Sequence, residues 1–480
     1  MNRNDFFLDR ARLFPVPEDT FMIETSLQFL GATGTVTGSK YLLEIDSKKY
    51  LIDCGLFQGL KALRLRNWKP LTVDPSKIDA VFLTHAHIDH SGYIPLLIKN
   101  GFRGKIYCTE PTFGLCSVLL PDSGHLQEED ALYANQKGYS SHKPAAPLYT
   151  ENDARKSLSF FSPVESNFKI ELDERYYAEF FPGGHILGAS ILQFNISGVR
   201  VTFSGDLGRY EDLLLYPPSS LETTDFLIIE STYGNRIHSN KDPHELLEKI
   251  VLNSIEENGC LLISAFAVGR TQQIIKIIYD LKKSGKIPEI PVFLDSPMAI
   301  EASRMFCRYS QFHRLTEKEC KQIMESIHFT ETVEKSMKIA ELEGPSIVIS
   351  ASGMATGGRI LHHLKRLLPE KKHTVLFTGF QAMGTRGESL IHGTKDVKIH
   401  GEWVPVEAKI ISIDSLSAHA DSGEIIKWIS QMKRTPKNIF ITHGEPAASE
   451  ALRIKISREL KQESRIPEYL EKLNLDDFLD

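Results

Sequence analysis

The chain shows two different patterns of hydrophobic and polar positions. Up to about residue 214, short β-prone runs alternate with Gly-rich or charged turns, and the runs at 27–30, 40–45 and 49–53 predict a β-meander. Further strand-like runs lie at 79–84, 177–181 and 200–203. Helices are expected at 123–137 and 152–160, with the Pro-rich loop 143–147 between them.

The hydrophobic pattern changes from about residue 215. Continuous apolar runs at 226–230, 260–265, 291–295, 346–350 and 374–378 alternate with helical stretches, which predicts a parallel sheet flanked by helices. Beyond residue 397 the first pattern returns, at 408–421 and 438–445. We therefore expect an α/β fold in which one domain, made of residues 1–214 and 398–480, is interrupted by a second at 215–397.

Composition is that of an ordinary soluble globular chain: 480 residues, 41% hydrophobic and 25% charged. The N-terminus has no apolar signal segment and no run is long enough to span a bilayer, so a cytoplasmic protein without membrane contact is expected. The six cysteines include no C-x-x-C pair and are expected to be reduced. The net charge of -6 argues against a generally basic nucleic-acid binder, but a metal centre or a local Arg/Lys lining could still hold a polyanion.

The stretch from Thr84 to His90 carries the strongest chemical signal. A lone histidine is usually a surface residue, whereas three imidazoles and a carboxylate within six positions form a metal-ligand set that suits Zn²⁺. Other strand-like runs also end in ligand-type residues. On its own, Asp53 could either cap a turn or point at a charged group. The candidates are Asp53, His85, His87, Asp89, His90, His185, Asp206 and His443.

Glycine-rich turns offer weaker signals. The turn at 31–40 has the wrong order of Ser and Lys for a phosphate loop and precedes a strand, so we reject it as a nucleotide site. Two later turns place Gly and one Arg, Arg270 or Arg359, where a helix begins. They either bind an anion or merely permit tight strand-to-helix turns.

The metal-ligand candidates resemble the four successive motifs of the metallo-β-lactamase fold, an αββα sandwich. The matching positions are Asp53, His85-x-His87-x-Asp89-His90, His185 and Asp206. Glu230 in Glu-Ser-Thr-Tyr-Gly, His419 in Ser-Ala-His-Ala-Asp and His443 in Thr-His-Gly-Glu resemble motifs A, B and C of the β-CASP nucleases, whose β-CASP domain is inserted in that sandwich. The resemblance spans residues 25–445 in order, with no motif missing.

The resemblance implies a role for each position. His85, His87 and His185 would hold one zinc and Asp89, His90 and His443 a second, with Asp206 bridging both. Asp53 and Asp89 are counted as catalytic, Asp53 by steadying the attacking hydroxide. His419, oriented by Glu230, resembles the family's general acid. Ser417, Arg270 and Arg359 are candidate phosphate contacts.

The implied function is a ribonuclease with two Zn²⁺ per chain that hydrolyses single-stranded RNA by a two-metal hydroxide mechanism, leaving 5′-phosphate and 3′-hydroxyl ends. The DNA-acting members of the β-CASP group tend to carry an apolar residue where His443 stands, so this histidine favours RNA as the substrate. Few residues follow Glu445, which favours endonucleolytic over processive cutting. A small-molecule metallohydrolase, a DNA nuclease and an inactive scaffold are the alternatives, and a homodimer is open. We expect RNA to bind between the domains, with Glu230, Arg270 and Arg359 supplied by the second.

Overall fold

The computed structural model describes residues 23–138, 143–165, 168–239, 241–413 and 415–478. The part of the expected first domain at residues 1–22 lies outside these ranges. Among the described residues, no helix combines the length and apolarity that crossing a membrane requires.

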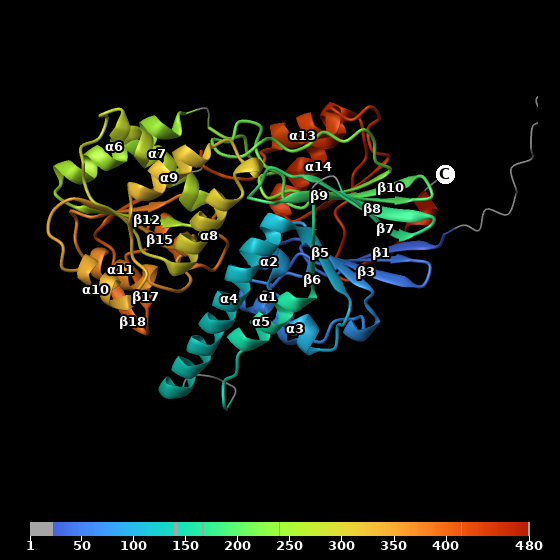
Figure 1. Cartoon of the computed structure of the whole chain (residues 1–480), viewed down its shortest axis with the longest axis horizontal. Coiled ribbons are helices and arrows are strands. Elements are labelled where there is room, and N and C mark those ends of the chain that lie inside the picture. Colours follow the sequence, from blue (N-terminus) through green and yellow to red (C-terminus); the bar gives the residue numbers. More distant parts are fainter. Residues whose placement is uncertain (1–22, 139–142, 166–167, 240, 414, 479–480) are drawn as a thin grey trace, which may run out of the picture.

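Two sheets face each other in the first domain (Figure 1). The antiparallel meander expected at the start opens the first sheet, and parallel strands continue it. In spatial order its strands are β21 (Lys472–Asn474), β1 (Thr25–Phe29), β2 (Tyr41–Ile45), β3 (Lys48–Ile52), β4 (Ala80–Phe82), β5 (Lys105–Thr109) and β6 (Phe161–Val164).

The second sheet joins the middle of the sequence to its C-terminal part. Strand β11 lies between β10 and β20 and pairs in parallel with both. In spatial order the strands are β20 (Asn438–Thr442), β11 (Phe226–Glu230), β10 (Val199–Phe203), β9 (Ser190–Ile196), β8 (Tyr176–Pro182) and β7 (Lys169–Asp173).

Three apolar layers hold this domain together. Between the sheets lies an aromatic layer that includes Phe82, Phe180 and Phe194, all fully buried. Helices cover the outer face of each sheet, and Leu97 and Trp428 are examples of the buried side chains that they contribute. This is the expected αββα sandwich. The helices are α2 (Ile88–Ser91), α3 (Ile94–Lys99), α4 (Glu110–Lys137) and α5 (Glu151–Ser157) on the first sheet's side, and α13 (Ser422–Ser430) and α14 (Pro446–Leu460) on the other. The short helix α1 (Lys61–Arg64) buries none of its residues.

The inserted domain is a separate parallel sheet, drawn in yellow and orange in Figure 1. Its order is β14 (His328–Phe329), β13 (Val292–Leu294), β15 (Ser346–Ala351), β12 (Cys260–Ala265), β16 (Thr374–Phe377) and β19 (Lys409–Ser412), with every pair parallel. Apolar clusters lie on both of its faces, so the expected flanked sheet is confirmed. Beside it are the hairpin of β17 (Asp396–Ile399) and β18 (Glu402–Pro405) and the helices α6 (Pro243–Glu256), α7 (Arg270–Lys283), α8 (Pro297–Arg308), α9 (Glu317–Glu325), α10 (Val333–Ile339), α11 (Ile360–Leu367) and α12 (Arg386–Ile391).

Strand pairing corrects two expectations about the domain limits. We expected the run 226–230 to open the second domain, but β11 belongs to the sandwich, so Glu230 is supplied by the metal-binding domain. Conversely, β19 pairs with β16 of the inserted sheet although we expected residues beyond 397 to return to the sandwich. A buried parallel strand reads as a continuous apolar run in either domain, so the pattern could not assign these two strands.

Phe82 provides a test of the aromatic layer. Its ring lies within 6.2 Å, between ring centroids, of the rings of Tyr50, Tyr107, Phe180 and Phe194. We expect Phe82→Ala to lower the free energy of unfolding by about 3–5 kcal/mol because it leaves a cavity. Chemical denaturation should show this as a lower unfolding midpoint. The control Phe168→Ala, at a ring that is 52% exposed, should change stability by less than about 0.5 kcal/mol. Equal effects of the two changes would contradict this account of the core.

Candidate metal centre

The ligand candidates meet at one edge of the sandwich because each lies at the end of a strand or within a few residues after it. In the two sheets, β3, β4, β8, β10, β11 and β20 all end at this edge. The expectation that separate strands bring the candidate ligands to a common place is therefore confirmed. The residues delivered are Asp53, His85, His87, Asp89, His90, His185, Asp206, Glu230 and His443.

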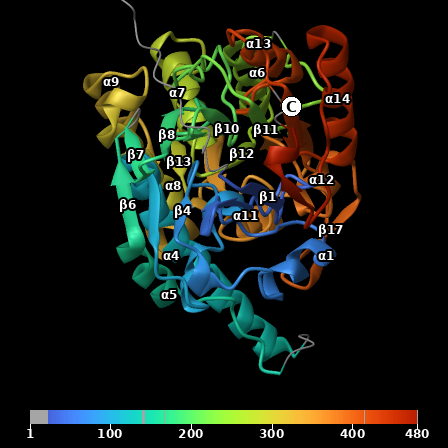
Figure 2. The same ribbon diagram turned by 90° about the vertical axis from the view of Figure 1, so that its right-hand side faces the viewer.

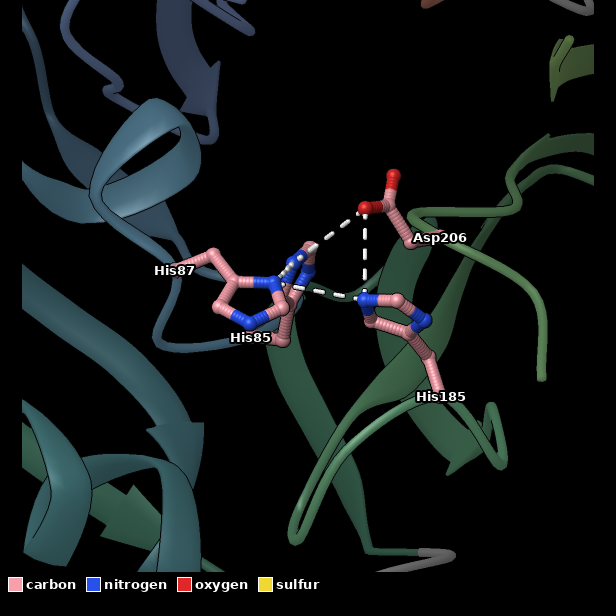
Figure 3. Close-up of side chains that lie close together, drawn as sticks. All are labelled: His85, His87, His185 and Asp206. Carbon is pink, nitrogen blue, oxygen red and sulfur yellow. Dashed lines mark hydrogen bonds and ion pairs between the residues drawn. The ribbon is translucent and has the colours of Figure 1, made fainter. Parts of the chain in front are cut away.

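The first ligand group consists of His85, His87, His185 and Asp206 (Figure 3). The Nδ1 of His87 lies 3.2 Å from the Nε2 of His85 and 3.2 Å from the Nε2 of His185. The Oδ2 of Asp206 lies 3.5 Å from each of those two Nε2 atoms. Three nitrogen atoms and one oxygen thus surround a common point, which is the donor set and spacing of a tetrahedral zinc site.

The second ligand group, Asp89, His90 and His443, lies on the other side of Asp206. The Nε2 of His443 is 3.1 Å from the Nε2 of His90 and 3.4 Å from the Oδ2 of Asp89. The second carboxylate oxygen of Asp206, Oδ1, lies 3.3 Å from the Nε2 of His90. Because its two oxygens face different groups, Asp206 is placed to be shared by two cations.

Burial of the first ligand group fits a bound cation. Burial lowers the pKa of His85 and His185 well below the usual value and that of His87 to about 4, so these imidazoles are neutral, as metal coordination requires. The Oδ1 of Asp206 is buried and has no hydrogen-bond partner among the described residues. Its charge faces imidazoles such as that of His90, whose Nε2 lies 3.3 Å away, and a bound cation would compensate a buried charge of this kind.

Asp53 acts on the second ligand group through His90. Its Oδ2 lies 2.7 Å from the Nδ1 of His90, and its Oδ1 accepts hydrogen bonds from the backbone N–H and the hydroxyl of Thr84 at 2.8 and 3.0 Å. The sequence left open whether Asp53 caps the next turn or faces a charged group; its side chain contacts His90 and Thr84, which are distant in sequence. In these contacts it orients a candidate ligand, and the steadying of a hydroxide stays a prediction.

His419 and Glu230 form the expected pair, although 189 positions separate them. The Nδ1 of His419 lies 3.1 Å from the Oε1 of Glu230, whose side chain is fully buried. Burial lowers the pKa of His419, but the negative charges of Glu230 and Asp206 outweigh it and hold that pKa above its usual value. The ring of His419 packs on that of His185 at 4.3 Å between centroids. A partly exposed, protonatable imidazole therefore stands beside the first ligand group.

Three supporting residues were missed by the sequence reasoning. The hydroxyl of Thr84 serves Asp53, and that of Thr232 lies 3.1 Å from the Nδ1 of His443. Both threonines sit inside the quoted motifs, which was a usable signal. The Nε2 of His238 contacts the backbone carbonyl of His419 at 2.9 Å, and no local pattern marks this residue. Asp421 and Glu424, near His238, form the capping box of α13.

The three phosphate candidates differ in their surroundings. The guanidinium of Arg359 is engaged by Asp295 at 2.7 Å and by the carbonyls of Thr330 and Glu331, so the structure favours a structural role. Ser417 is buried, and its hydroxyl accepts a hydrogen bond from the backbone N–H of His419 at 3.3 Å. Arg270 begins α7 and is buried; its Nη1 donates to the Oε1 of Gln273 at 2.7 Å, and its Nε has no hydrogen-bond partner among the described residues.

Comparison with known proteins agrees with this geometry. Residues 33–115 match the Metallo-beta-lactamase superfamily, 271–390 the Beta-Casp domain, and 403–467 the Zn-dependent metallo-hydrolase RNA specificity domain. Ribonuclease TTHA0252 of Thermus thermophilus is 32% identical over 426 residues, which cover 86% of this chain and 92% of that protein. The chain belongs to the β-CASP family of the metallo-β-lactamase superfamily. It is thus a metal-dependent hydrolase.

Other relatives show how far the similarity to β-CASP proteins extends. Transcription termination factor FttA of Methanosarcina mazei is 30% identical, with 93% of this chain and 71% of that protein covered. The RNase J-like protein of Methanocaldococcus jannaschii is 28% identical, with 92% and 97% covered. A solved protein of unknown function from Enterococcus faecalis V583 shares the fold, with a TM-score of 0.53, 14% identity, and 94% and 99% of the two chains covered.

The contact of Asp53 with His90 yields a test of the metal centre. Asp53→Asn removes the charge that orients this imidazole, so we expect metal affinity to fall by about 10–100-fold. Titration against a competing chelator measures it. Asp79→Asn is the matched control, because that carboxylate pairs with Lys48 at the surface and should leave affinity unchanged. Unchanged metal affinity in Asp53→Asn would show that Asp53 does not support the site.

Proposed function

We propose that this protein is a ribonuclease that cuts single-stranded RNA internally by hydrolysis. The observation that carries the proposal is the arrangement of two ligand groups on either side of Asp206, with the His419–Glu230 pair beside them. The match of residues 403–467 to an RNA specificity domain supports RNA as the polymer, because this segment contains both His419 and His443. The names of the relatives, a ribonuclease and an RNase J-like protein, support it further.

Two zinc ions per chain complete the proposal. The first ion would be held by His85, His87 and His185 and the second by Asp89, His90 and His443, with Asp206 shared by both. Bound there, two such ions supply Lewis acidity toward a phosphodiester and activate water at neutral pH. The remaining chemistry belongs to side chains of the protein.

His419 is placed to supply the proton that the leaving 3′-oxygen needs. Its Nδ1 is held by Glu230, so the opposite ring nitrogen, Nε2, is the one that can donate to a substrate. Two contacts fix the backbone of His419. Its carbonyl contacts the Nε2 of His238, and its N–H donates a hydrogen bond to the hydroxyl of Ser417. Arg270 would add positive charge for a phosphate.

The ends of the products test this function most directly. With a 5′-labelled single-stranded RNA, zinc-loaded protein should release internal fragments with a 3′-hydroxyl and a 5′-phosphate, and a chelator should abolish cutting. DNA of the same sequence should be cut more slowly. Attack by water predicts no cyclic phosphate, because the 2′-hydroxyl of the RNA takes no part.

Three outcomes would count against the proposal. A 2′,3′-cyclic phosphate would mean attack by the RNA's own hydroxyl. Preferred cutting of the DNA would favour a DNA nuclease of the same fold. No cutting of either polymer, with turnover of a lactam or thioester, would favour the small-molecule hydrolase.

The Glu230 contact predicts a shift in pH dependence. Because the carboxylate raises the pKa of His419, Glu230→Gln should lower it, and His419 should lose its proton at lower pH. The limb at which activity falls with rising pH should therefore move to lower pH, while metal content stays the same. The control Glu222→Gln removes a surface carboxylate and should leave the profile in place. A profile that Glu230→Gln does not move, at normal turnover, would refute the pairing.

A further inference from the structure

A basic surface lies on the segment that follows Asp53 and contains α1. Between Asp53 and Asp74 the chain carries no acidic residue and four basic ones. Trp68, in the same segment, is 57% exposed. We call this group the basic surface; it consists of Lys61, Arg64, Arg66, Trp68 and Lys69.

The positive charges of this surface are not neutralised by the protein. Of the described residues, none with a carboxylate comes within ion-pair distance of Lys61, Arg64, Arg66 or Lys69, whereas many exposed cations elsewhere have such a partner, Lys99 and Arg155 for example. Burial raises the pKa of Asp130 and the positive charge of Arg64 opposes this rise, but no ion pair joins the two side chains. Arg66 instead lies over the ring of Tyr469, with 4.0 Å between its guanidinium carbon and the ring centroid. In a chain of net charge -6, such a surface indicates an anionic partner.

The chain connects this surface closely to the ligand residues. The backbone N–H of Cys54 donates to the carbonyl of His90 at 2.6 Å, and that of Leu56 donates to the carbonyl of Ile88 at 3.0 Å. A Cβ on Gly55 would lie 1.5 Å from the carbonyl oxygen of Asp89, so the two segments pack backbone to backbone. Lys61 follows Leu56 by five residues, which span at most about 18 Å.

The surface also reaches the inserted domain. A Cβ built on Gly59 would lie 3.2 Å from the carbonyl oxygen of Met383, and one on Gly384 would lie 3.2 Å from a methyl carbon of Leu60. The turn before α12 thus approaches the start of α1, and Figure 2 shows both helices on the same side of the molecule. A polymer held at the metal centre could therefore continue over α1 without leaving the boundary between the domains.

We propose that the basic surface binds the RNA strand on one side of the cut: Lys61, Arg64 and Lys69 contact successive phosphates, and Trp68 stacks on a base. This inference rests on the proposed ribonuclease function and adds a binding site outside the metal centre. Single strands are commonly bound by a basic path together with an exposed aromatic ring, because the path follows the phosphates and the ring accepts any base. An acidic protein partner is the rival occupant.

The test measures binding and its salt dependence. The triple change K61Q/R64Q/K69Q leaves Arg66 in place because that side chain packs on Tyr469. It is made in the zinc-loaded His419→Ala protein so that the RNA stays intact. The control is K318Q/K321Q/K335Q, which removes three exposed lysines of the inserted domain and the same net charge.

We expect the triple change to weaken binding of a 12-nucleotide RNA roughly tenfold and to reduce the slope of log affinity against log salt by about 2, since each lost contact to a single strand contributes about 0.7. The deficit should be smaller for a trinucleotide, which cannot reach from the metal centre across the surface. Trp68→Ala should weaken binding roughly tenfold with little change in slope. The control should keep the affinity and slope of the parent protein.

Each failure has its own meaning. If the parent protein does not bind RNA and the active protein does not cut it, the proposed function fails. If RNA is bound and cut but the triple change matches the control in affinity and slope, the basic surface is not an RNA site, and the acidic partner becomes the better explanation. A loss of affinity that is equal for the trinucleotide and the 12-nucleotide RNA would also overturn the proposal.

Discussion

The carboxylate of Asp206 is the constraint on which the site depends. Its side chain is almost fully buried, and imidazoles of both ligand groups lie within 3.5 Å of its two oxygens. Removing so many polar groups from water is unfavourable unless cations compensate. The site therefore needs a scaffold whose stability comes from elsewhere, and the aromatic layer between the two sheets supplies it.

The order of the strands follows from the same constraint. Ligands widely separated in sequence can meet only if their strands end at one edge, and the parallel pairs of β11 with β10 and β20 bring Glu230 and His443 there together. Two of these residues adopt left-handed backbone conformations, Asp53 with φ 56° and His443 with φ 48°. Such strain in non-glycine residues is found where function requires a particular direction of the side chain. The inserted domain reaches the site through the turn between β12 and α7, where Phe266 lies 6.5 Å, between centroids, from the ring of His87.

Much of this could be predicted from the sequence, since it depends on local pattern. Strands ending in His or Asp indicated a common edge with candidate ligands, and the resemblance of these residues to the metallo-β-lactamase motifs implied the sandwich. The assignment of β11 and β19 to sheets could not be predicted, because an apolar run does not say which sheet buries it. The helix expected at 123–137 begins earlier, at Glu110; Pro121 lies inside α4, where its neighbours Leu119 and Leu120 are buried, so packing outweighs the hydrogen bond that proline removes. The use of Arg359 by Asp295, 64 positions away, likewise depends on tertiary contacts that no motif records.

The central claim is that Asp206 stands between two metal ions. Anomalous diffraction at the zinc absorption edge, from crystals of zinc-loaded protein, tests it most directly. We expect two peaks, one among His85, His87 and His185 and one among Asp89, His90 and His443, roughly 3.5–4 Å apart with Asp206 between them. A single peak at saturating zinc, or a peak beside His238 and Asp421 with none at Asp206, would contradict the account.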